Sequence, residues 1–360
     1  MGAGFGAGFG AGFGAGFGAG FGAGFGQGPA DNQGVLANAI TLSRAALVGP
    51  FQGATLPINL PTPLDKPDRL ADWAVGPRMQ ICELDLLAGL HFDVNQSKEL
   101  VSVDFVDLNK KPLKSRTLIR LVRPTAKVFK QQLELVANYS ELREDRGSEI
   151  LTQANGFLAF TAAIIGLHAH RHKWTLELLD LSLSLASHVE MRFKHAFACP
   201  RPVELSPQIQ PPIPTPGHAS WPSGHATEAY VVSTVVQALL PHGAKYKEQL
   251  ERQAARIAVN RTVAGLHYPV DSAVGRLLGT GLADFFVARC IGNNKLHERG
   301  FNGRKFHDAQ GHTIDFDPRV SMANNQSGYY EYLSAVGSIA ASPLMAFMWA
   351  KAAKEWQPIQ

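Results

Sequence analysis

The chain has 360 residues, of which 45% are hydrophobic and 18% are charged, and its mean hydropathy is −0.05. These values exclude a wholly disordered polymer and a protein built mainly from membrane-spanning helices. The formal net charge of +4, from 34 basic and 30 acidic residues, is too small for a general polyanion binder, so we expect no nucleic-acid partner. Three widely spaced cysteines give neither a disulfide framework nor a cysteine-rich zinc site.

The N-terminus is a low-complexity segment in which Gly-Ala-Gly-Phe repeats six times between Gly2 and Phe25. Glycine at every second position makes ordering costly, so we expect residues 1–30 to form a disordered tail. Phenylalanine and alanine would share one face of a strand, and self-association through the repeat is therefore an alternative role for the chain. The segment lacks the basic and leucine-rich parts of a secretion signal, and we expect no signal peptide.

Residues 31–124 are predicted to form an irregular N-terminal region with one short strand. Val101, Val103 and Phe105 alternate with polar residues, as in a strand that buries one face. Residues 50–77 are rich in proline and glycine and indicate a loop.

Residues 125–360 are predicted to form a helical catalytic domain. Phe129, Leu133 and Val136 recur at helical spacing, and similar patterns continue to the end of the chain. The predicted fold class is therefore all-α, a helical bundle with a small irregular N-terminal region. The main predicted helices cover residues 155–170, 174–197, 223–240, 245–263, 271–289 and 328–356.

Two uncharged stretches were compared with membrane spans. Residues 153–167 are too short, and residues 332–350 are interrupted by Gly337 and Pro343. Both are interpreted as core helices, so we expect a soluble protein without an integral membrane span. The compartment and the oligomeric state, including a homo-oligomer, stay open.

Three short motifs carry the candidate chemistry. Taken singly, each has an ordinary structural explanation: the basic residues suit a solvated helix end, and Ser223 and Asp271 suit helix caps. In chain order the motifs are Lys194 followed after six residues by Arg201-Pro202, then Pro222-Ser223-Gly224-His225, then Asn260-Arg261 followed after five residues by His267 and after three more by Asp271.

Taken together, the motifs predict a site for a tetrahedral or trigonal oxyanion. Lys194, Arg201 and Arg261 bring three cations from separate segments, and such a cluster repels itself unless an anion lies inside it. Ser223 and Gly224 would open a helix whose free N–H groups attract the same anion. His225 and His267 would exchange protons, with Asp271 holding one imidazole by Nδ1 and leaving Nε2 as a nucleophile or ligand.

The order and internal spacing of these motifs resemble the superfamily that joins type 2 phosphatidic acid phosphatases, bacterial acid phosphatases and vanadium-dependent haloperoxidases. The resemblance covers about residues 190–280 and their helical surroundings, and it implies the helical bundle of that superfamily. Asn260 departs from the serine usual in the phosphatases and leaves the contacting residues unchanged.

The resemblance implies a role for each motif residue. His267 would be the metal ligand of vanadate, or the phosphorylated nucleophile of a phosphatase, with Asp271 orienting it. His225 would bond the apical oxygen or protonate a leaving group. The remaining oxygen contacts would come from Lys194, Arg201, Ser223, the Gly224 N–H and Arg261.

His218 favours the haloperoxidases among these relatives. It lies seven residues before His225, with Trp221 between them, and the arrangement resembles the vanadium bromoperoxidases. The hypothesis is therefore a vanadate-dependent haloperoxidase that uses hydrogen peroxide to oxidise halide, chiefly bromide or iodide, to hypohalous acid, which then reacts with an organic acceptor. A soluble acid phosphatase that hydrolyses phosphate monoesters through a phosphohistidine is the alternative enzyme.

Overall fold

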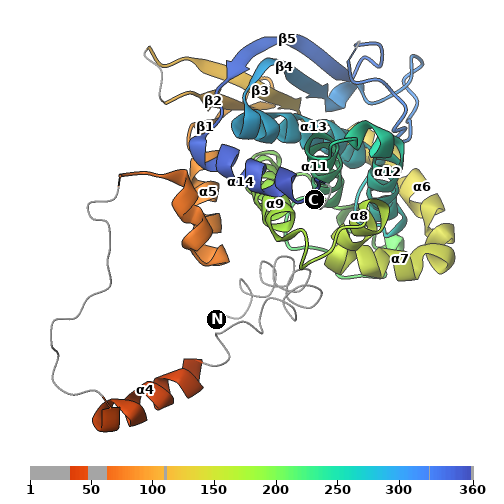
Figure 1. Ribbon diagram of the computed structural model, residues 1–360. Helices are drawn as coiled ribbons and strands as arrows, with labels where there is room; N and C mark the ends of the chain where they lie inside the picture. The colour runs from red at the N-terminus through yellow and green to blue at the C-terminus, as the bar shows by residue number, and fades with distance from the viewer. Residues whose placement is uncertain (1–32, 48–62, 109–111, 324, 358–360) are drawn as a thin grey trace. The chain divides into compact units, whose positions relative to one another are not determined.

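The computed structural model describes residues 33–47, 63–108, 112–323 and 325–357 (Figure 1). The chain divides into two units, residues 1–71 and residues 72–360. The first contains helix α4 (Gln33–Leu47), and the short 3-10 helix η2 (Pro67–Asp72) ends at the first residue of the second. The repeat tail predicted over residues 1–30 lies outside the described residues.

The second unit contains a five-stranded mixed sheet, which corrects the all-α prediction. The strand order is β1-β2-β3-β4-β5, and every neighbouring pair is antiparallel except β3 and β4, which are parallel. The predicted strand around Val103 is β2. The strands are β1 (Leu90–Asn95), β2 (Leu100–Val106), β3 (Ser115–Val122), β4 (Asn293–Asn302) and β5 (Tyr330–Ile339).

Four of the five strands were not predicted from the sequence pattern, and β4 and β5 lie within the region predicted to be helical. Strand β4 is largely polar, and β5 occupies the first part of the helix predicted over residues 328–356. Neither segment alternates cleanly, because what stabilises them is pairing with distant strands: Ile119 of β3 lies opposite Arg299 of β4. Only residues 343–354 of the predicted helix are helical, as α14.

The helices agree better with the predicted ranges. The predicted helices 174–197, 223–240, 245–263 and 271–289 correspond closely to α9, α11, α12 and α13, whereas only part of 155–170 is helical, as α8. The α-helices of this unit are α5 (Val75–Leu87), α6 (Ala126–Asn138), α7 (Arg143–Gly156), α8 (Leu158–Ile165), α9 (Lys173–Phe197), α10 (Pro202–Leu205), α11 (Gly224–Leu239), α12 (Lys247–Val263), α13 (Pro269–Ile291) and α14 (Pro343–Lys354).

Helix α13 lies between the sheet and the other core helices (Figure 1). The rings of Phe105 on β2 and Phe285 on α13 lie 5.2 Å apart, centroid to centroid. On its other side α13 approaches α11 closely at two glycines. A Cβ on Gly279 would lie 2.2 Å from the carbonyl oxygen of Thr227, so only glycine allows this approach.

The close approach of α11 and α13 brings their first turns together. The N–H of Ser223, before α11, donates to the carbonyl of Asp271 in the first turn of α13 at 3.1 Å. The second and third sequence motifs therefore meet because two core helices pack tightly. Within the described ranges, no helix has both the length and the hydrophobicity to cross a membrane.

Candidate oxyanion site

Lys194 lies in the last turn of α9 and is buried. Its Nζ donates to the carbonyls of Ala219 at 3.3 Å and Ser220 at 3.1 Å, and also to that of Pro222. Burial lowers the pKa of Lys194 to about 8, although the nearby Glu190 carboxylate opposes this shift. The ammonium group thus holds the loop before α11 in place, a role that the sequence did not indicate.

Arg201 follows α9 after a short turn and is almost completely buried. Its Nε donates to the carbonyl of His218 at 3.1 Å, and its Nη1 donates to the carbonyl of Leu266 at 2.9 Å. The same Nη1 lies 3.0 Å from Nε2 of His267. Its backbone N–H is accepted by the Glu204 carboxylate, which closes a capping box at α10. The guanidinium therefore joins the first motif to the third.

His267 is fixed from both sides of its ring. Its Nδ1 lies 2.8 Å from Oδ2 of Asp271, a carboxylate that also accepts from the Ser220 hydroxyl and from the Tyr268 N–H. An ionised Asp271 accepts only, so the neutral ring carries its proton on Nδ1 and presents the Nε2 lone pair to Arg201. Burial, and then the charges of Arg201 and Lys194, lower the pKa of His267 well below its usual range.

Asp271 acts both as helix cap and as partner of the histidine. It lies in the first turn of α13, where its side chain accepts the N–H of Tyr268 at 3.2 Å in a capping box. Burial raises its pKa to about 6, and the bonds from Ser220 and Tyr268 oppose that shift. Asp271 is therefore a helix cap, as its residue type suggests, and also the hydrogen-bond partner of His267.

The second motif forms the start of α11. Ser223 is the N-cap, and its hydroxyl accepts the Ala226 N–H at 3.4 Å. Gly224 is the first helical residue, and a Cβ there would lie 2.7 Å from Oε1 of Glu190. His225 is half-buried beside Phe157, with ring centroids 6.3 Å apart. Burial, followed by the charges of Arg261 and Lys194, lowers the pKa of His225 to about 3, so the ring is neutral at neutral pH.

Arg261, near the end of α12, keeps part of its donor capacity free. Its Nη2 donates to the carbonyl of Ile150 at 3.1 Å and to Oε1 of Gln153 at 3.2 Å. Its Nε and Nη1 are buried and have no hydrogen-bond partner in the described structure. Burial lowers the pKa of Arg261 to about 10, which leaves the group charged at neutral pH. An oxyanion would satisfy these two donors.

The donor set suits an anion. The positive charges of Lys194 and Arg201 lower the pKa values of both His225 and His267, and the charge of Arg261 lowers that of His225. The three cations therefore act together on the two imidazoles. No group of three or more His, Cys, Asp or Glu side chains in the described ranges converges as a metal-cation site would require. Phosphate and vanadate, which have the same shape and charge type, both fit this set of cations, orphaned donors and helix N-terminus.

His218 lies at the rim of the site and does not contact His267 directly. The residue is exposed, but one edge of its ring is turned inward: Nδ1 lies 3.1 Å from Nη2 of Arg201 and 3.2 Å from the carbonyl of Ala219. Loss of solvent around the ring and the charges of Lys194 and Arg201 lower its pKa to about 4. Loss of solvent and the cations that place this ring at the site both favour its neutral form.

Two carboxyl groups beside the site were not found from the sequence. Glu190 lies one turn before Lys194 on α9, and Glu228 lies one turn into α11. Burial and mutual repulsion raise the pKa of Glu190 to about 8, and burial raises that of Glu228 to about 7. Oε2 of Glu190 is buried without a hydrogen-bond partner. The only sequence feature that pointed to Glu190 was its position four residues before Lys194. Such Glu–Lys pairs are common on exposed helix faces, so the spacing did not indicate a buried carboxyl group.

The region that contains all nine predicted site residues matches a known family model. Residues 177–295 match the PAP2 superfamily. This match covers about a third of the chain and is compatible with phosphatase or haloperoxidase activity. No curated protein matches the chain.

Proposed function

We propose that the chain is a vanadate-dependent haloperoxidase that oxidises halide, chiefly bromide or iodide, with hydrogen peroxide. The observation that carries the proposal is the fixed His267: Asp271 holds Nδ1, and Nε2 faces the cationic set, where Arg261 keeps two unpaired buried donors. In this function hydrogen peroxide, halide and a proton give hypohalous acid and water.

The hydrogen-bond donors and cations of the site indicate which residues would hold vanadate. His267 would bind the metal through Nε2, and its present partner Arg201 would turn one N–H to an oxygen. Arg261 and the N–H of Gly224 would hold further oxygens, together with Ser223. Lys194 would contribute an oxygen contact by releasing one of its three carbonyl partners. When bound, vanadate supplies a Lewis-acid centre that activates hydrogen peroxide toward halide.

The protonation states of His218 and His225 bear on both functions. Both rings are neutral at neutral pH, because burial and nearby cations lower their pKa values to about 4 and about 3. Rings with such low pKa values are weak bases, and the negative charge of a bound oxyanion would raise both values toward the range in which an imidazole gives or takes a proton. The feature that favours the haloperoxidase is His218 itself, seven residues before His225 and with Nδ1 at 3.1 Å from Nη2 of Arg201.

One observation favours an acid phosphatase as the second candidate. The Glu190 carboxyl lies against Gly224, and its pKa, raised to about 8 by burial and Glu228, keeps it protonated at neutral pH. In that reaction Nε2 of His267 would attack phosphorus, the ester oxygen would leave with a proton from a group such as Glu190, and water would release phosphate from the histidine.

One sample tests both functions. The full-length protein, freed of vanadium, is titrated with orthovanadate while bromination of a phenolic dye by hydrogen peroxide and bromide is followed. The same sample is assayed for hydrolysis of an aryl phosphate. We expect bromination that requires vanadate and is suppressed by phosphate. The exposed His242→Ala is the matched control for His267→Ala, which should lose the activity.

The outcomes separate the candidates. Phosphate ester hydrolysis that orthovanadate inhibits, with no bromination at any vanadate concentration, would replace the haloperoxidase by the phosphatase. If the protein shows neither activity and binds neither phosphate nor vanadate, both candidate functions are excluded, because both require the oxyanion site.

A further inference from the structure

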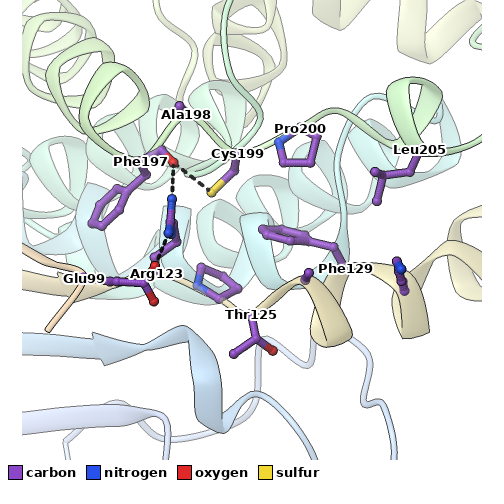
Figure 2. Close-up of a pocket in the computed structure, with 12 residues that line it drawn as sticks. Glu99, Arg123, Thr125, Phe129, Phe197, Ala198, Cys199, Pro200 and Leu205 are labelled. Atoms are coloured by element: carbon purple, nitrogen blue, oxygen red, sulfur yellow. Dashed lines mark hydrogen bonds and ion pairs between the residues drawn. The ribbon is translucent and has the colours of Figure 1, made fainter. Parts of the chain in front are cut away.

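A cavity lies beside the segment that precedes Arg201. It has a volume of about 420 Å³ and is bounded by the end of β3, the first turn of α6 and residues 197–200 (Figure 2). None of the nine predicted site residues lines it. Its volume is typical of cavities that bind small organic molecules.

The walls of this cavity are mainly apolar. Phe129 faces it from α6 (Figure 2), and Phe197, Pro124, Pro200 and Leu205 complete the apolar lining, with the Phe197 ring packed on Trp221. Such walls gain most from a ligand with an aromatic or alkyl body. The cavity also contains Cys199, but burial raises the pKa of its thiol to about 12, so the thiol is not a nucleophile at neutral pH.

The polar side of the cavity carries an excess of positive charge. Glu99 accepts from Arg123 and from Arg304, the latter at 2.6 Å, so one carboxylate is shared by two guanidinium groups. Lys130 is a further cation in the lining of the cavity. The first turn of α6, capped by Thr125, also lies at the cavity and has no acidic residue to neutralise its N–H groups.

Both walls of the cavity continue into the oxyanion site. Pro200 directly precedes Arg201, and the carbonyl of Cys199 accepts the N–H of Ser220 at 3.0 Å. On the opposite wall the ring of Phe129 lies 4.9 Å from that of Tyr268, the residue after His267. A ligand in the cavity would thus contact Cys199 and Pro200 directly, and it would be separated from the segment of His267 by Phe129.

We propose that this cavity binds an organic anion with an apolar body, the acidic group held by the lining cations Arg123 and Lys130 and the body packed against Phe129. The inference does not depend on which oxyanion the neighbouring site takes. Binding is non-covalent.

The test is calorimetric titration of the full-length protein with octanoate, octylammonium and acetate. Octanoate combines the alkyl body and the negative charge, and each of the other probes lacks one of the two. We expect octanoate to bind one site per chain at least about tenfold more tightly than either of the others. Saturating inorganic phosphate should leave octanoate binding in place, because phosphate competes only for the oxyanion site.

Two pairs of variants locate the binding. Ala126 is exposed and lines the cavity, whereas the next residue, Lys127, is exposed and does not. Ala126→Trp should therefore abolish octanoate binding, and Lys127→Trp should leave it unchanged. Lys130→Gln should weaken binding by about three- to tenfold through loss of one nearby charge, and Lys127→Gln should not.

Circular dichroism and the unfolding midpoint establish that each variant is folded. Equal binding of octanoate and octylammonium would overturn the charge assignment. Octanoate binding that survives Ala126→Trp, or that phosphate displaces, would overturn the location. Failure of octanoate to bind the parent protein would overturn the proposal as a whole, whatever the outcome of the bromination and hydrolysis assays.

Discussion

Nη1 of Arg201 lies 3.0 Å from Nε2 of His267, on the side of the imidazole opposite Asp271. The nitrogen proposed to bind vanadate or attack phosphorus is therefore already a hydrogen-bond acceptor within the protein. An incoming oxyanion would have to take over this Arg201 N–H before Nε2 can react. The guanidinium thus keeps the neutral tautomer of His267 in place until an anion binds.

His267→Ala should abolish vanadate retention, because no other residue of the site offers an imidazole nitrogen held in this orientation. Equilibrium dialysis with orthovanadate measures the effect, and His242→Ala on the protein surface is the control. Full retention by His267→Ala would show that the ligand has been assigned to the wrong residue.

Arg261→Lys should weaken the binding of both phosphate and vanadate by about ten- to a hundredfold, the equivalent of about 1.5–3 kcal/mol for charge-assisted hydrogen bonds. Lysine keeps a positive charge but loses the planar donors of which two are unpaired here. Arg256→Lys is a matched control on the same helix, since Arg256 pairs with Glu149 at 2.8 Å and is largely exposed. Calorimetric titration with each anion compares the two variants. Equal affinities in both would place the anion away from Arg261.

Lys194→Met should lower the free energy of unfolding by about 1–3 kcal/mol, because the loss of Nζ leaves buried carbonyls without a donor. Catalysis should fall further than anion affinity, since the loop that carries Ser220 and Pro222 loses its fixed position. Denaturant unfolding and dialysis measure the two effects. Lys173→Met, an exposed change at the other end of α9, is the control. An unchanged unfolding midpoint in Lys194→Met would show that the ammonium group does not hold this loop.

His218→Phe should change the ratio of bromide to iodide turnover while leaving vanadate affinity nearly unchanged. The pH–rate profiles of variant and parent should coincide at neutral pH and diverge only near about pH 4, because the lowered pKa keeps His218 neutral above that value. Both profiles are measured at saturating vanadate. A divergence centred near neutral pH would mean that the ring is more solvated than its contact with Arg201 indicates.

Glu190→Gln should stabilise the protein relative to the parent increasingly as the pH rises from about 4.5 to about 8. In the unfolded chain Glu190 ionises near its ordinary pKa, whereas in the folded chain it keeps its proton up to about pH 8. The folded state of the parent therefore binds more protons in this range, and its stability falls with rising pH. Glutamine has no such dependence.

Thermal unfolding at about pH 5 and about pH 8 gives the comparison for Glu190→Gln. Glu248→Gln, an exposed change on α12, is the control and should show no pH-dependent difference from the parent. The same midpoint difference at both pH values would mean that Glu190 is ionised in the folded protein.

The core helices were predictable from the sequence because their signals are local. Helix α9 begins and ends within a residue of the range read from its leucine pattern, and Ser223 caps α11 as its residue type suggests. The order of charged, helix-opening and imidazole residues also indicated an oxyanion site. Each helix signal, and the spacing within each motif, depends on residues that lie within a few turns of each other along the chain.

Tertiary packing decided the features that the sequence pattern did not contain. The pairing of β3 with β4 joins segments far apart in the chain, so the polar residues of β4 gave no sign of a strand. Likewise Lys194 donates to backbone carbonyls, and every residue has a carbonyl, so the sequence cannot tell which ones a buried ammonium group will meet. The placement of Glu190 against Gly224 follows from the packing of α9 on α11. Such contacts are fixed by which surfaces meet when the core forms, and residue spacing along the chain leaves them open.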